Sequence, residues 1–187
     1  MSFRPKWRNL FLITVYLLGA IYLVIPHPTE APSLSDVQST EPGDTWQNPN
    51  QKAFFTNKNR SQVLLELQDK FALNIFGFKY KGFRLNYRPE ESGVLVRDQI
   101  MTNYLEEIIH PFRESIFING WEPTNAPIYK GYLPKDIPGI HIDGKNYISK
   151  VTIRPQNSQT IPRLVIWTLC FPALFLIYRT FKHIRNV

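Results

Sequence analysis

Two apolar stretches near the ends of this 187-residue chain constrain its fold more than any other feature. Residues 10–25 contain one threonine and two tyrosines as their only polar side chains, and residues 164–178 contain no charged side chain. A helix needs roughly 20 residues to cross about 30 Å of hydrocarbon. With their neighbouring residues both stretches approach that length, so the sequence predicts two transmembrane helices, at residues 9–26 and 163–180.

The basic residues are distributed unevenly around these stretches. The chain has 22 Lys and Arg against 15 Asp and Glu, and every acidic residue lies between the two stretches. The cations that flank the stretches are Arg4, Lys6, Arg8, Arg163, Arg179, Lys182 and Arg185. Because cytoplasmic loops carry excess Lys and Arg, we predict a multi-pass protein of the cell membrane with both termini, residues 1–8 and 181–187, in the cytoplasm. Residues 27–162 would then be extracytoplasmic, and their neutrality argues against nucleic acid as a partner.

Each stretch has an alternative interpretation. The first resembles a signal peptide, but no small-residue cleavage site follows Ile25 and the stretch exceeds the usual apolar region of about 7–15 residues. The second could be an amphipathic helix in the interface, but it is apolar on all sides. The single cysteine, Cys170, lies within the second stretch, so the middle of the chain has no disulfide.

The middle of the chain divides by composition. Residues 27–50 are rich in proline and poor in large apolar residues, which predicts an extended tether. Residues 51–154 form the predicted domain, and residues 155–162 link it back to the second stretch. Asn59 and Gln62 resemble a helix capping pair before a helix at residues 60–72, and an apolar stripe predicts a longer helix at residues 94–109.

The remaining patterns predict short antiparallel strands. Residues 76–80 and 83–87 alternate with period two, and the alternation changes parity at Gly82. A hairpin turn or a bulge at Gly82 would account for that change equally well. Residues 143–146 indicate a second turn, between strands that begin at residue 140 and end at residue 153. The fold class is therefore an α+β extracytoplasmic domain, with two main helices and short hairpins, between two transmembrane helices.

A cationic strand face is the candidate binding site. It consists of Lys79, Lys81, Arg84 and Arg88, and such a face could bind an anionic lipid headgroup or wall polymer. The simpler interpretation is a solvated sheet face whose lysines prevent edge-to-edge pairing.

No catalytic or metal-binding motif is recognisable. Glu107, His110 and Glu114 would share one face of a continuous helix, but Pro111 disturbs the register and no matching set exists elsewhere. Ion pairing on a helix surface explains the three residues more simply. We therefore predict no catalytic residue, no metal and no cofactor.

The function predicted from these patterns is binding rather than catalysis. We expect a structural or assembly subunit of an envelope complex, with membrane lipid as a partner and other membrane proteins or a second copy as further partners. Binding of an anionic envelope ligand by the cationic face is the alternative, and an envelope enzyme with a site around Glu107 and His110 is the third hypothesis.

Overall fold

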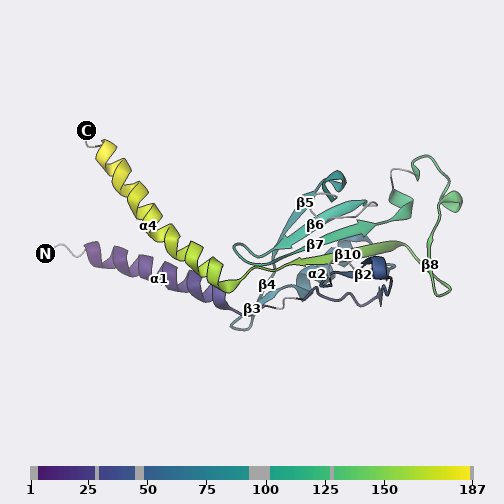
Figure 1. The fold of residues 1–187 in the computed structure, drawn as a ribbon, viewed down its shortest axis with the longest axis horizontal. Coiled ribbons are helices and arrows are strands. Elements are labelled where there is room, and N and C mark those ends of the chain that lie inside the picture. The colour runs from purple at the N-terminus through teal and green to yellow at the C-terminus, as the bar shows by residue number, and fades with distance from the viewer. Residues whose placement is uncertain (1–3, 28–29, 45–48, 93–101, 127–128, 186–187) are drawn as a thin grey trace. The chain divides into compact units, whose positions relative to one another are not determined.

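The computed structural model describes residues 4–27, 30–44, 49–92, 102–126 and 129–185 (Figure 1). It divides into two compact units. The helical unit consists of Met1–Pro26 and Ser158–Val187, and the domain consists of His27–Asn157. The domain is therefore wider than the predicted 51–154.

The helical unit contains α1 (Arg4–Val24) and α4 (Thr160–Arg185). Among the described residues, α4 alone is long and apolar enough to cross a membrane. The apolar part of α1 is Asn9–Val24, which at about 1.5 Å per residue measures only about 24 Å. The prediction of two flanking transmembrane helices is therefore wrong, because the first stretch forms an apolar helix shorter than the hydrocarbon core.

The two helices of this unit pack against each other most closely at Gly19. A Cβ atom on Gly19 would lie 2.2 Å from the Trp167 ring, so glycine is the residue that admits the indole. The Trp167 Nε1–H donates to the Tyr16 carbonyl at 3.1 Å, and the Phe171 ring lies 5.3 Å from the Tyr16 ring, edge to face. Contacts of this kind, with a small residue beneath a large one, allow close helix packing.

Six of the described strands form one antiparallel sheet in the order β1-β2-β10-β7-β6-β5. Their bounds are Val37–Gln38 (β1), Lys52–Thr56 (β2), Ser149–Gln156 (β10), Ser115–Trp121 (β7), Tyr104–Ile109 (β6) and Phe83–Tyr87 (β5). Short 3-10 helices occur at Pro42–Asp44, Pro89–Glu91, Pro123–Asn125 and Pro134–Asp136. The fold is α+β, as predicted, but its main element is one large six-stranded sheet, and two of the strand pairs form separate hairpins.

The predicted helix at residues 94–109 is wrong where the structure describes it. Residues 104–109 are β6, and residues 93–101 lie outside the described residues. Both faces of β6 are buried: Ile108 belongs to the main core, whereas Leu105 packs with Phe117 on the opposite face. A strand buried on both sides loses its alternation, and its apolar residues can match a helical stripe.

Helix α2 (Arg60–Lys70) confirms the helix predicted at residues 60–72. Its N-terminus is closed by the expected capping box, in which the Asn59 side chain accepts from the Gln62 backbone and the Gln62 side chain accepts from the Asn59 backbone. Its buried side chains are Val63, Leu64 and Leu67, and these join the core with residues from the sheet. The apolar face of α2 thus packs against the sheet, and the domain core lies between them.

Residues 30–44 pack on the domain instead of forming an extended tether. Ala31 and Leu34 are buried in the main core. Strand β1 pairs with β2, and the Ser39 backbone N–H donates to the Ala53 carbonyl at 2.8 Å. Residues 28–29 and 45–48 of the predicted tether lie outside the described residues.

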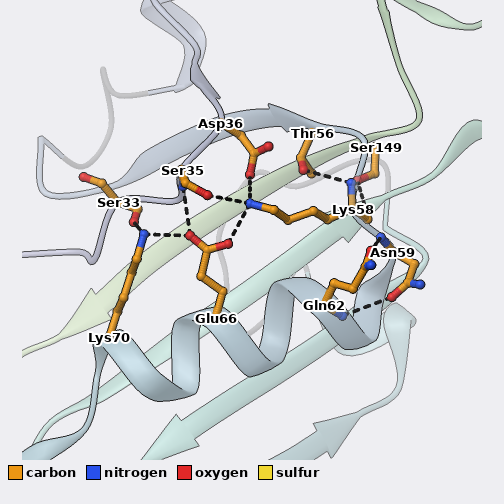
Figure 2. A network of polar contacts seen from close by, with 10 residues as sticks. All are labelled: Ser33, Ser35, Asp36, Thr56, Lys58, Asn59, Gln62, Glu66, Lys70 and Ser149. Carbon is orange, nitrogen blue, oxygen red and sulfur yellow. Dashed lines mark hydrogen bonds and ion pairs between the residues drawn. The ribbon is translucent and has the colours of Figure 1, made fainter.

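A network of charged side chains fastens this segment to α2 (Figure 2). The Lys58 Nζ donates to Ser35, Asp36 and Glu66 at 2.7, 2.6 and 2.7 Å. On the other side of the Glu66 carboxylate, Lys70 donates at 2.6 Å. Burial alone would raise the pKa of Glu66, but the hydrogen bonds from the two lysines outweigh it and hold this pKa at about 2.

Neither alternative predicted at Gly82, a hairpin that pairs residues 76–80 with 83–87 or a bulge in one long strand, is correct. Strand β3 (Leu73–Ile75) pairs with β4 (Phe78–Tyr80), and the turn between them is formed by Phe76 and Gly77, with φ of 50° and 86°. Strand β5 pairs with β6 instead. Gly82 lies between the two sheets, where an added Cβ would meet the Ile109 carbonyl oxygen at 2.8 Å, so close backbone approach explains this glycine.

The turn predicted near residues 143–146 is confirmed. Strands β8 (Ile140–Ile142) and β9 (Lys145–Tyr147) pair across Asp143 and Gly144, which have φ of 49° and 72°. Two consecutive left-handed residues form the tight hairpin turn that Asp-Gly favours.

The Glu66 network predicts acid sensitivity. The folded-state pKa of Glu66 is depressed, so its stabilising contribution is present above the unfolded pKa of about 4.5 and is lost as the pH falls from there toward about 2. After allowance for solvent screening, Glu66→Gln should remove on the order of 1 kcal/mol of the pH-dependent stability.

Urea unfolding of the full chain in detergent, followed by tryptophan fluorescence at pH 7 and pH 3, measures this contribution. The exposed Glu30→Gln variant is the matched control and should behave like the wild type. An equal loss of stability at pH 3 in the wild type and in Glu66→Gln would contradict the assignment.

Candidate functional site

The predicted cationic residues do not share one sheet face. Lys79 and Lys81 lie near the β3–β4 hairpin, 3.3 and 3.6 Å from the two carboxylate oxygens of Asp69. Arg84 lies on β5, where its Nη2 is 3.4 Å from Glu106. Arg88 is exposed just before the 3-10 helix Pro89–Glu91. These residues are divided because β4 and β5 belong to different sheets; binding of an anionic ligand by them stays a prediction.

A buried carboxylate organises the sheet face beside the start of α2. Glu106, on β6, is only 2% exposed and accepts hydrogen bonds from Arg60, one of them from Nε at 2.9 Å. Arg84 approaches the other carboxylate oxygen from the neighbouring strand. A second Arg60 nitrogen donates to Asn86 at 2.9 Å, and the guanidinium carbon lies 5.1 Å from the centre of the Tyr104 ring. Arg60 is thus held by a carboxylate, an amide and an aromatic face.

Two adjoining hollows surround this arginine. The larger measures about 340 Å³ and is lined by Asn59, Arg60, Ser61, Asn103, Tyr104, Glu122 and Asn125. The smaller measures about 260 Å³ and is lined by Arg60, Asn86, Tyr87, Arg88, Pro89, Asn103 and Tyr104. They share Arg60, Asn103 and Tyr104, and we call the two together the Arg60 hollow. The larger volume falls within the usual range of ligand pockets.

Two residues that line this hollow also carry buried donors with no hydrogen-bond partner among the described residues: the Tyr104 hydroxyl and the Asn103 Nδ2. The Asn103 amide is fixed in this orientation because its Oδ1 accepts from the Glu122 backbone N–H. Burial, together with the nearby Glu122 carboxylate, raises the pKa of Tyr104, so its hydroxyl keeps its proton at neutral pH. Unsatisfied buried donors cost about 1–3 kcal/mol each, which an acceptor supplied by a partner would offset.

Gly120 gives the Tyr104 ring its position. The two residues are opposite each other in the pairing of β6 with β7, and a Cβ on Gly120 would lie 2.0 Å from the ring. The ring therefore lies flat across the glycine instead of standing away from the sheet.

A second polar cluster lies at the other end of α2. The Phe71 carbonyl, at the C-terminus of this helix, accepts from His27 Nε2 at 3.2 Å and from His110 Nε2 at 2.8 Å. The His27 Nδ1 lies 3.4 Å from Glu114, which also accepts from Arg113 at 2.7 Å. The side chains of His27, Glu114 and Arg113 are all less than one-tenth exposed, and His110 is 1% exposed.

This cluster corrects the predicted arrangement of Glu107, His110 and Glu114. They do not share a helix face, because His110 and Glu114 flank the turn between β6 and β7. Glu107 instead accepts from the Tyr87 hydroxyl at 2.6 Å. Among the described residues, no group of three or more His, Cys, Asp or Glu could hold a metal ion.

The sequence prediction missed Arg60, Glu106, Asn103, Tyr104 and His27. Glu106 could have been recognised, because a carboxylate within an apolar segment is unfavourable unless a buried partner pairs with it. The other residues carried no such signal, because their roles depend on contacts with distant parts of the chain.

Comparison with known protein families, with curated proteins and with solved structures gives no match for this chain.

The His27–His110 cluster predicts a loss of stability in mild acid. Burial lowers the pKa of His110 below its usual 6.5, although the hydrogen bond to Phe71 opposes this shift. The groups that face it are His27, Glu114 and Arg113. Because the unfolded chain binds the proton first, stability falls as the pH drops below about 6.5.

His110→Gln keeps a side-chain donor for Phe71 but cannot titrate, so its free energy of unfolding should vary less between pH 7 and pH 5 than that of the wild type. His141, which is exposed, supplies the control variant His141→Gln. The same slope in all three proteins, measured by urea unfolding of the full chain in detergent, would show that His110 does not titrate in this range.

Proposed function

We propose that this protein is a membrane-anchored, non-catalytic binding subunit of an envelope complex. In this proposal α4 is the anchor and the domain carries the surface that binds the partner. The observation that carries the proposal is the Arg60 hollow, where two buried donors lack acceptors among the described residues. A partner whose carbonyl or carboxylate group enters the hollow and displaces the side chains that cover these donors would satisfy them.

The surface of α4 supports the anchor. Its side chains are mostly apolar and exposed between residues 164 and 178, among them Leu169, Leu174 and Phe175 at 60%, 62% and 63%. A continuous apolar helix of this kind is stable in hydrocarbon and unfavourable in water.

The basic residues that follow this apolar surface support one orientation of α4 across the membrane. Arg179, Lys182 and Arg185 follow it, and no acidic residue follows it. By the positive-inside rule, the C-terminal end of α4 faces the cytoplasm and the domain is extracytoplasmic.

One observation supports the alternative hypothesis that the ligand is an anionic envelope molecule. Arg88 is exposed and lines the smaller part of the Arg60 hollow. The other three predicted cations each lie beside a carboxylate, which weakens their attraction for an anion.

Affinity purification from membranes in mild detergent tests the assembly role. The full chain should be recovered in a particle larger than one chain. Ser61→Trp places an indole in the Arg60 hollow from an exposed position and should reduce recovery of the partner about tenfold, equivalent to about 1.4 kcal/mol.

The control is Leu65→Trp, one turn further along α2 at a site that is 57% exposed and outside the hollow. It should leave recovery unchanged. A particle with the mass of one chain would contradict the assembly role, and full recovery with Ser61→Trp would exclude the hollow as the docking point.

Cysteine labelling tests the orientation. In a Cys170→Ser background, a cysteine at the exposed Asn146 should react with a membrane-impermeant maleimide in intact cells. A cysteine added after Val187 should react only once the membrane is permeabilised. The reverse pattern would contradict the orientation.

A further inference from the structure

The two ends of the domain leave it at the same place, beside the turn between β6 and β7. At the C-terminal end, Gln156 pairs with Ser115, the first residue of β7. At the N-terminal end, the His27 ring lies 5.3 Å from the His110 ring, at the start of the same turn. We call this part of the domain the exit end.

Four exposed phenylalanines surround the exit end. Phe76 and Phe78, on the β3–β4 hairpin, are 86% and 79% exposed. Phe112, in the β6–β7 turn, is 71% exposed, and Phe83, opposite Ile109 at the start of β5, is 56% exposed. We call these four residues the phenylalanine rim.

The hairpin that carries half of this rim is fixed to the exit end. The Tyr80 ring on β4 lies 5.8 Å from the His110 ring and 6.3 Å from the Phe83 ring. Figure 1 shows the β3–β4 hairpin and the β6–β7 turn at one end of the domain, with β8 at the opposite end.

Two of the rim residues occupy backbone conformations that disfavour them. Phe76 and Phe112 have φ of 50° and 60°, in the left-handed region where glycine and asparagine are preferred. Their rings are exposed, so packing within the domain does not offset this cost. A partner that takes up the rings would account for phenylalanine at both turn positions.

The short link between the domain and α4 indicates that the partner of the rim is the lipid bilayer. The domain ends at Asn157 and α4 begins at Thr160, so the link spans at most about 10 Å. If α4 spans a bilayer, the exit end cannot lie far from that bilayer's surface. Because α4 already tethers the domain to the bilayer, the lipid surface is present at a high effective concentration near the rim.

The shape and charge of the rim also fit a lipid surface. Phe76 and Phe112 lie on two separate turns, and Phe78 and Phe83 are the first residues of β4 and β5. Phenylalanine is favoured on surfaces that insert at the boundary of headgroups and acyl chains. Lys79 and Lys81 lie beside the rim with one carboxylate, Asp69, between them, which leaves a net positive charge for anionic headgroups.

We propose that the phenylalanine rim inserts into the headgroup region of the bilayer that α4 spans. This inference rests on the proposed anchor. The rim is a second membrane contact in addition to α4.

Fluorescence quenching in vesicles tests the proposal with the full chain. In a Cys170→Ser background, single cysteines replace Phe76, Phe112 or, as the control, Asn146 on β9, and each carries the same environment-sensitive dye. The proteins are reconstituted into phosphatidylcholine–phosphatidylglycerol vesicles that contain lipids with a nitroxide near the headgroup. The dye at positions 76 and 112 should be quenched several-fold more than the dye at position 146.

A fourth sample separates the rim from the anchor. The dye is attached to the native Cys170 within α4 and is tested with lipids whose nitroxide lies deep in the acyl chain. Quenching at position 170 without quenching at 76 and 112 would overturn the rim proposal, favour a protein partner for these rings, and leave the anchor standing. Absence of quenching at position 170 would overturn the anchor and, with it, the rim. Circular dichroism of each labelled protein confirms that the chain is folded.

Discussion

The domain depends on the burial of one short helix, α2, against the sheet. Its buried stripe, Val63, Leu64 and Leu67, supplies one side of the core, and fully buried leucine or valine side chains contribute about 1.5–3 kcal/mol each. Both ends of the helix are also fixed. The capping box and Arg60 hold its start, and the Phe71 carbonyl at its end accepts from two histidines. The Arg60 cluster and the His27–His110 cluster are therefore each built on one terminus of α2.

This arrangement explains why the two clusters differ in character. At the start of α2, a buried carboxylate and two partly exposed arginines leave room for a hollow that opens to solvent. At its end, the histidines, Glu114 and Arg113 are enclosed, and both histidines donate to the Phe71 carbonyl. The first cluster is open to solvent, as the proposed contact with a partner requires. The second lies where the two ends of the domain meet, and it holds them to the core.

The parts of the fold that could be predicted from the sequence are those set by local chemistry. The Asn59–Gln62 cap and the Asp143–Gly144 turn each involve residues at most three apart, so the sequence alone specifies them. Strand β6 could not be predicted, because burial on both faces hides its alternation. The hairpin at Phe76–Gly77 was missed because phenylalanine is rare in a left-handed turn position.

The candidate site was hidden from the sequence for a different reason. Arg60 and Glu106 meet through the packing of α2 on β6, and neither residue identifies the other along the chain. The cationic residues show the opposite relation: they are close together in the sequence, but the structure divides them between two sheets. Strand order, which no local pattern encodes, decides both outcomes.

The position of α2 has a mechanical consequence. The Arg60 hollow lies at the start of this helix and the exit end lies at its finish, and an eleven-residue helix measures about 16 Å. The hollow and the exit end are therefore separated by about the length of this helix. A molecule bound in the hollow, as proposed, would lie at that distance from the point where the chain leaves the domain.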